Sequence, residues 1–329
     1  MPRKHTVGKA DSETAPDVFV IVDVEPDAVV GGDDADLAGP HRAFEMLETM
    51  RRELANERGL TINYSWMMRA DRHVHETYGT STHLLERFAD TLEECRSKGD
   101  LVGAHVHAFA DSHDHEDWRD PQSLAIDAEV SCNSFEEVLG RPPEAIGFAR
   151  GFTSIPAVEV SRRRGVRFDF SVVPGISAPT SSDTLKVIAA PFDNNTVPLT
   201  PYRPSADDWR TPDPNMTTGP TIVPLTPARI NEWQSRRARL RVRGEQAALD
   251  RRTHHVYLMN IDQPGFARVF KSRAVLDSGY LTMSVRSSRF LMTSDAQLRG
   301  IADRLSSIGG TSANLTTAAH SARTTLQPA

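Results

Sequence analysis

The chain has 329 residues, of which 39% are hydrophobic and 25% are charged, and its formal net charge is −6. A chain of this length can bury a large core without help from disulfides or structural metals. Its negative charge argues against a nucleic-acid partner, which usually binds a basic surface. No run approaches the ~20 apolar residues of a membrane span, and residues 1–16 lack the apolar core of a secretory signal. We therefore expect a cytoplasmic protein without membrane contact, in which Cys95 and Cys132 stay reduced.

Helices and strands are expected to alternate along the first half of the chain. Residues 1–16 are polar and patternless and are interpreted as a flexible tail. The valine-rich run 17–23 (DVFVIVD) predicts a buried strand that ends in Asp23. By helical spacing of apolar residues and by terminal glycines, helices are expected at 40–58, 82–98, 122–139 and 155–164. Short apolar runs predict strands at 61–68, 101–106, 145–149 and 166–172.

The second half is less regular. Residues 191–230 are rich in proline, aspartate and threonine, and we interpret them as a long loop or insertion that faces the substrate. The remaining expected elements are a basic helix at 228–251, strands at 255–260 and 280–285, a helix at 294–308 and a tail at 319–329.

The alternation predicts the fold class. Strands that alternate with helices across short loops form a parallel sheet with helices outside it. About seven such units favour an α/β fold of the distorted (β/α)7-barrel type, with mostly parallel strands, in a single domain over residues 17–318. In such barrels the chemistry lies at the C-terminal ends of the strands.

Polar residues follow two of these expected strands. Asp23, Glu25 and Asp27 follow the first strand, and His105 and His107 end the third. Carboxylate oxygens and imidazole nitrogens are zinc ligands, and a spare carboxylate beside the metal could take a proton from water. Either cluster alone is a weak signal, because the loop that follows also carries His113 and His115 and a merely histidine-rich loop remains an alternative.

Five segments, taken in order, resemble the polysaccharide deacetylase superfamily, the NodB-homology group that includes carbohydrate esterase family 4. These segments are 22–25 (VDVE), 65–69 (SWMMR), 103–107 (GAHVH), 148–151 (FARG) and 168–175 (FDFSVVPG). The resemblance covers residues 17–175 well and residues 176–318 loosely. Their shared order and spacing are more specific than any one segment.

The resemblance implies a role for each matching residue. Asp23 would be the catalytic base, Glu25 a metal ligand with Asp27 as the alternative, and Arg150 the arginine that holds the base. His105 and His107 would complete the metal site, which would hold a divalent ion, with zinc as the first choice. On the same basis we expect substrate contacts from Trp66, Arg69, Phe152, Asp169 and Ser171. The family's reaction is hydrolysis of an N-acetyl or O-acetyl group from a sugar.

Three departures from the family pattern affect the reaction. The histidines are two residues apart instead of four, and Val24 separates the two acids. In the segment 280–286 (YLTMSVR), which resembles the family's last strand, Arg286 stands where the family has a general-acid histidine. Arginine stays protonated at neutral pH and is a poor proton donor, although it can bind an oxyanion. His254, His255 or a loop histidine could supply the proton instead.

The sequence therefore predicts a metal-dependent hydrolase that removes an N-acetyl or other acyl group from an amino sugar or a related small molecule. Arg286 keeps two alternatives open: a metal-dependent epimerase, isomerase or cyclase, and a non-catalytic binding protein. The expected partner is a small-molecule or sugar substrate, and self-association is left open.

Overall fold

The computed structural model describes residues 17–27, 37–108, 121–175, 194–229, 253–261 and 280–308. The tails expected at 1–16 and 319–329 lie outside these ranges, and so do His113 and His115. The helix expected at 228–251 also lies outside them, apart from its first two residues, which belong to a strand. None of the helices in the described ranges is long and apolar enough to cross a bilayer.

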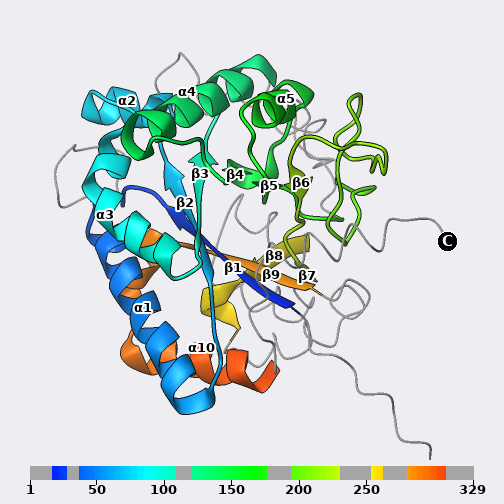
Figure 1. The fold of residues 1–329 in the computed structure, drawn as a ribbon. Coiled ribbons are helices and arrows are strands. Elements are labelled where there is room, and N and C mark those ends of the chain that lie inside the picture. Colours follow the sequence, from blue (N-terminus) through cyan, green and yellow to red (C-terminus); the bar gives the residue numbers. More distant parts are fainter. Residues whose placement is uncertain are drawn as a thin grey trace, which may run out of the picture.

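One curled sheet forms the centre of the described structure (Figure 1). Its strands are β1 (Asp17–Val24), β2 (Tyr64–Arg69), β3 (Leu101–Val106), β4 (Ala145–Phe148), β5 (Phe168–Asp169), β6 (Thr221–Ile222), β7 (Pro227–Arg229), β8 (Thr253–Tyr257) and β9 (Tyr280–Arg286). They lie in the order β6-β5-β4-β3-β2-β1-β9-β8-β7, and every neighbouring pair is parallel except β7 with β8. This arrangement confirms the predicted single-domain, mostly parallel, distorted barrel.

Helices cover the outer face of this sheet (Figure 1). They are α1 (Ala38–Arg58), α2 (Arg72–Tyr78), α3 (His83–Ser97), α4 (Pro121–Leu139), α5 (Ile155–Arg163) and α10 (Asp295–Ile308), with short 3-10 turns η2 (Ala149–Gly151), η4 (Leu258–Asn260) and η6 (Ser287–Met292). The predicted end of α1 is confirmed, because Gly59 takes the left-handed conformation there with φ 64°.

Strand alternation divides the apolar residues into two cores. On β1, Val20 and Val22 face outward and pack in the large cluster under the helices. Phe19 and Ile21 face inward and pack with Met67 of β2 in a second cluster inside the barrel. Because side chains alternate along a strand, the polar residues that continue these inward rows lie together at the C-terminal ends of the strands.

The inward row of β3 needs a glycine. A Cβ at Gly103 would lie 2.6 Å from the carbonyl oxygen of Ala145 and 2.8 Å from Sδ of Met67. Gly103 precedes His105 by two residues on the same face, so it lets β2, β3 and β4 pack closely beneath that histidine.

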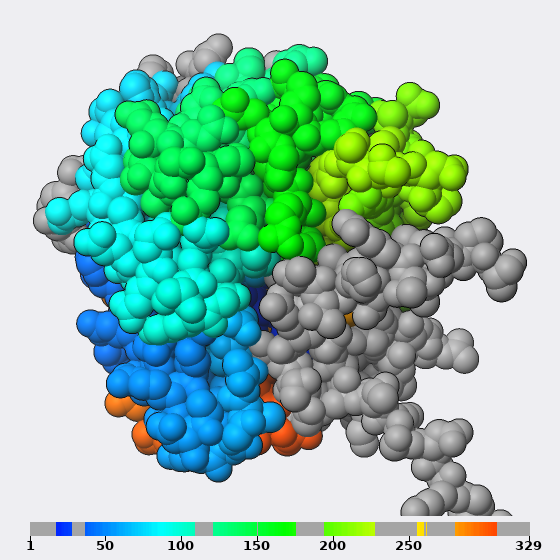
Figure 2. Space-filling model, viewed as in Figure 1, coloured from blue at the N-terminus to red at the C-terminus, as the bar shows by residue number. Residues whose placement is uncertain are grey.

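The segment predicted as a loop at 191–230 carries β6 and β7 within its described part. Trp209 and Tyr202 are buried with Ile222 against Val158 of α5, and Figure 2 shows this segment beside α5. β6 and β7 are consecutive in sequence but occupy opposite ends of the sheet order. Residues 223–226 are too few to span more than about 18 Å, so the two edges of the curled sheet lie close together.

Those connecting residues bond to both edges. The backbone N–H of Leu225 donates to the carbonyl of Val172 at 2.8 Å, and that of Thr226 donates to Thr282 of β9 at 3.0 Å. Val256 of β8 donates in turn to the carbonyl of Thr226 at 2.9 Å. The segment 223–226 thus ties the β5 side of the barrel to its β8–β9 side.

Candidate metal centre

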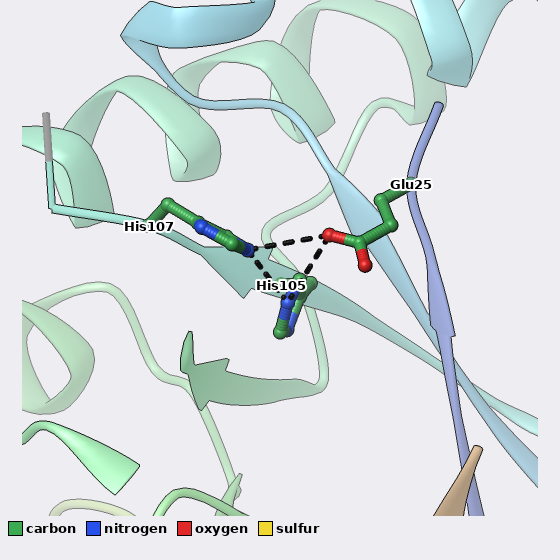
Figure 3. A group of neighbouring side chains, drawn as sticks. All are labelled: Glu25, His105 and His107. Carbon is green, nitrogen blue, oxygen red and sulfur yellow. Dashed lines mark hydrogen bonds and ion pairs between the residues drawn. The ribbon is translucent and has the colours of Figure 1, made fainter. Parts of the chain in front are cut away.

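Three side chains converge where β1 and β3 end (Figure 3). Glu25 follows the last residue of β1, His105 lies on β3, and His107 follows it. His107 Nε2 lies 3.0 Å from His105 Nε2 and 3.3 Å from Glu25 Oε2. The third separation, from His105 Nε2 to Glu25 Oε2, is 3.9 Å. The sequence placed these three residues at one site from strand-end positions, and the structure brings them together.

The three separations fit a metal site. A tetrahedral zinc ion with nitrogen and oxygen ligands at about 2.0–2.1 Å has ligand atoms about 3.3 Å apart. The measured separations of 3.0, 3.3 and 3.9 Å scatter around that value. Among the described residues, this is the one group of three or more His, Cys, Asp or Glu side chains whose ligand atoms lie within 4.8 Å of one another. These residues could therefore hold a divalent ion.

The protonation states of His105 and Glu25 are those of metal ligands. Burial and, after it, the neighbouring His107 lower the pKa of His105 to about 3, so His105 is neutral at pH 7. Burial alone would raise the pKa of Glu25, but its hydrogen bond to His107 and the charges around it hold that pKa well below its usual range. A neutral imidazole and an ionised carboxylate are the forms that bind metals.

Asp23 stands beside the three ligands without being one of them. Its Oδ1 lies 3.5 Å from Nδ1 of His105, the ring nitrogen on the far side from Glu25. Burial and the nearby Glu25 raise the pKa of Asp23 to about 7, while Arg286 and His107 oppose that rise. The carboxyl group of Asp23 can therefore play either of two roles. It can be the partner of the His105 ring, or it can accept a proton from a molecule bound at the triad.

A buried carboxylate, Asp71, organises the β2 side of the site. Its Oδ2 accepts hydrogen bonds from the backbone N–H of His107 at 3.1 Å and from Nε of Arg69 at 2.9 Å. Its Oδ1 accepts the N–H groups of His73 and Val74, both at 3.1 Å, as the N-cap of α2. Asp71 therefore fixes the backbone of one candidate ligand and the start of a helix with the same side chain.

Arg69 links this carboxylate to the triad. It is buried, its NH1 lies 3.9 Å from Oε2 of Glu25, and its NH2 lies 2.7 Å from Nδ1 of His73. The resemblance predicted that Arg69 contacts the substrate. The structure places it at the site but packed beside Glu25, where it supports a ligand.

The β8–β9 side of the site is polar and more open. Arg286 is in register with Asp23, and its Nε lies 3.4 Å from Oε1 of Glu25 while half of its side chain is exposed. Ser284, two residues earlier on the same face, bonds Nε2 of His255 at 2.7 Å. The ring of Tyr257 contacts that of His255 at a tilt of 43°, with ring centroids 4.1 Å apart. His255 thus lies on this inner wall, whereas the side chain of His254 lies outside the described part.

Other predicted site residues lie elsewhere. Trp66 is 1% exposed, stacks on Phe44 of α1 and donates from Nε1 to Asp100 at 2.8 Å. Its side chain belongs to the outer row of β2, opposite to that of Met67 and Arg69, so a substrate at the triad would not reach it. Asp27 accepts the backbone N–H of Gly39 at 2.6 Å, at the start of α1, and is not in the triad.

The remaining three predicted substrate contacts are also buried. Asp169 accepts the N–H of Ser171 at 2.8 Å, and Ser171 Oγ accepts the N–H of Phe148 at 2.8 Å. Asp169 is in register with Ile146 and therefore faces the helices. Phe152 packs in the same outer core. The backbone of Arg150 lies in η2, but its side chain is outside the described part, so its role as holder of the base stays a prediction.

Sequence reasoning missed Asp71, Tyr257 and Ser287. Ser287 Oγ accepts the N–H of Glu25 at 3.2 Å and donates to its carbonyl at 3.0 Å. The strand-end rule that selected Asp23 would have selected Asp71, which lies two residues past β2. No sequence signal identified Tyr257 or Ser287, because their positions depend on how β9 pairs with β1 and β8 with β9.

Comparisons with known proteins agree with this fold. No family model matches the chain, and no curated protein matches it in sequence. A solved structure described as a polysaccharide deacetylase from Mycobacterium smegmatis aligns with a TM-score of 0.51 and 10% identity, over 98% of this chain and 95% of that one. An allantoinase aligns at 0.42 and 10% identity over 92% and 89%, and the peptidoglycan deacetylase PdaC from Bacillus subtilis at 0.28 and 11% over 89% and 95%.

The chain thus has the fold of the polysaccharide deacetylases, as the sequence resemblance predicted. At these identities the likeness concerns the fold, and function has to be argued from the site.

Proposed function

We propose that this chain is a metal-dependent hydrolase that removes an N-acetyl or similar acyl group from an amino sugar or a related small molecule. The observation that carries the proposal is the triad of Glu25, His105 and His107, with ligand-atom separations of 3.0, 3.3 and 3.9 Å, beside a second carboxyl group, that of Asp23. A divalent ion held by the triad would lower the pKa of a water molecule and polarise the acyl oxygen.

Residues around the triad would hold its members in place and transfer protons. Arg69 and Ser287 hold the side chain and the backbone of Glu25. Asp71 holds the backbone of His107. Asp23 Oδ1, beside His105, accepts the proton that the attacking water loses as its oxygen bonds to the acyl carbon.

The C–N bond then breaks, and the amine needs a proton. Arg286 cannot supply it, because its guanidinium stays protonated at neutral pH. Asp23 holds the proton taken from water and can pass it to the amine, so that one carboxyl group serves both transfers and the products are a carboxylic acid and an amine.

Two measurements test this proposal. The purified chain is analysed for bound metal, loaded with zinc, and assayed for acetate release from N-acetylated amino sugars. Asp23→Asn should retain the metal and lose at least about 100-fold in turnover, in keeping with the usual size of general acid–base effects. Absence of a bound divalent ion from the wild-type chain, or full turnover by Asp23→Asn, would reject the proposed mechanism.

A second candidate is favoured by Arg286 in the position where the resembling family has its general-acid histidine. A site with a metal and a base but no separate acid suits proton abstraction, as in an epimerase or isomerase. Such an enzyme would exchange a substrate C–H proton with deuterated solvent and release no acetate. The proposed hydrolase would release acetate and exchange no C–H proton. NMR in deuterium oxide records both signals in one experiment.

A further inference from the structure

The wall of the site formed by β8 and β9 presents hydrogen-bond donors that the triad does not use. Nε of Arg286 lies 3.4 Å from Oε1 of Glu25, and its side chain is 51% exposed. In the described part of the chain, its two terminal nitrogens have no hydrogen-bond partner. Tyr257 is 38% exposed and faces the same side of the sheet, since it is in register with Ser284.

These two donors are diagonal neighbours on adjacent strands, because Tyr257 is in register with Ser284 and Arg286 lies two residues beyond Ser284. Burial raises the pKa of the Tyr257 hydroxyl. The charge of Arg286 lowers that pKa, and the charge of Asp23 raises it. Arg289 of η6 acts on the same hydroxyl. Tyr257 is therefore a protonated donor beside one guanidinium, with a second in electrostatic range. Together, Arg286 and Tyr257 form the donor wall.

The charge balance of the site points to the ligand for that wall. Asp23, Glu25 and Asp71 bring three carboxyl groups, and Arg69 and Arg286 bring two guanidiniums. A divalent ion in the triad would leave an excess of positive charge among these groups even with every carboxyl ionised. A neutral sugar would not offset that excess, whereas an anionic substrate would.

We propose that the donor wall is an oxyanion-binding subsite, and that the acylated substrate carries a carboxylate or phosphate group near the amide that is cleaved. The planar guanidinium of Arg286 can bind either group through two parallel hydrogen bonds, and the phenol of Tyr257 adds a third. This inference rests on the proposed function for the identity of the acyl group, but not for binding of the anion.

The test compares three N-acetyl compounds that share one sugar ring: N-acetylglucosamine, N-acetylmuramic acid with its carboxylate, and N-acetylglucosamine 6-phosphate. Dissociation constants are measured by calorimetry on the zinc-loaded Asp23→Asn chain. We expect at least one of the two anionic compounds to bind about 10-fold or more tightly than the neutral one, and its identity tells carboxylate from phosphate.

Variants of the donor wall test whether its two residues cause the preference for anionic compounds. Arg286→Gln should reduce the ratio of anionic to neutral affinity to near one, Arg286→Lys should keep part of it, and Tyr257→Phe should reduce it a few-fold. Arg42→Gln is the matched control, because Arg42 lies on α1 and pairs with Glu45 and Asp295 away from the site. Equal binding of all three compounds, or an unchanged ratio in Arg286→Gln, would overturn the inference.

The outcomes separate this inference from the proposed function. Tight binding of an anionic compound with no acetate release from wild type would retain the subsite and reject the hydrolase. Acetate release at equal efficiency from neutral and anionic compounds would retain the hydrolase and reject the subsite.

Discussion

The two sides of the site differ in how completely their polar groups are engaged. On the β1–β3 side, Glu25, His105 and His107 are at most 7% exposed, and Asp71 accepts hydrogen bonds at both of its oxygens. On the β8–β9 side, Arg286 and Tyr257 are partly exposed. Buried side chains held by their neighbours keep a fixed geometry, as metal ligation requires, whereas partly exposed donors can exchange water for a ligand. This difference fits the proposal that the ion binds on the β1–β3 side and the substrate on the β8–β9 side.

The largest expected effect is loss of the ion. His107→Gln removes one of three candidate ligands and should abolish zinc binding at micromolar concentrations, along with turnover, because the remaining pair cannot complete the site. Equilibrium dialysis followed by elemental analysis measures this.

The matched control is His83→Gln. His83 stacks on Tyr78 at 4.3 Å on α3, away from the triad, and its replacement should leave zinc binding intact. Stoichiometric zinc in His107→Gln would show that the β1–β3 side is not the metal site.

A smaller effect is expected from Asp71→Asn. All four hydrogen bonds to Asp71 come from N–H donors, so an amide NH2 in either orientation faces donors instead of acceptors. The backbone of His107 and the side chain of Arg69 would shift, and zinc affinity should fall about 10–100-fold, the usual cost of losing a group that orients ligands. Competition with a chromogenic chelator gives the affinity.

Asp127→Asn provides the comparison. Asp127 is also fully buried, but it lies on α4, where it accepts hydrogen bonds from Nε of Arg72 at 2.9 Å and from NH2 of Arg72 at 3.0 Å. Both variants should lose stability, and only Asp71→Asn should lose zinc affinity. Equal zinc affinities in the two variants would remove Asp71 from its positioning role.

The smallest effect concerns a buried carboxyl group that belongs to neither side. Burial raises the pKa of Asp169 from 3.8 to about 6 in the folded protein, with bonds to Ser171 opposing the rise. The folded state therefore binds the proton more tightly than the unfolded state, and this contribution to stability is present below about pH 4 and lost as the pH rises through 6. Asp169→Asn mimics the neutral form and should stabilise the protein above pH 6 by up to about 3 kcal/mol.

The free energy of unfolding of Asp169→Asn and of the wild type, measured in urea at pH 4 and at pH 7.5, tests this pH dependence. The gain should be absent at pH 4 and present at pH 7.5, with zinc affinity and turnover unchanged because Asp169 faces the helices. A gain of equal size at both pH values would contradict the assigned cause.

Much of the fold followed from local patterns. The alternation of apolar runs and capped helices predicted the parallel sheet, and the strand-end rule predicted that Glu25, His105 and His107 meet. The rule worked because the C-terminal ends of parallel strands lie at one edge whatever their order in the sheet.

The misplaced residues needed information that a motif does not contain. Trp66 and Arg69 were taken together as one motif, yet they are three positions apart on a strand and so point to opposite faces. Asp27 was grouped with Glu25 by proximity in sequence, but the chain turns and its carboxylate meets the start of α1. β6 and β7 are only two and three residues long, too short for a periodic signal, and they depend on pairing with distant strands.

The short tie at residues 223–226 constrains what the protein can accept. Its backbone belongs at once to both rims of the curled sheet, through bonds from Leu225 to Val172 and from Thr226 to Thr282. Separating the two edges of the sheet would break these hydrogen bonds, and the loss of each would cost on the order of 1 kcal/mol. The separation between the histidines and Arg286 is therefore fixed by the fold, and a substrate that contacts both has to match it.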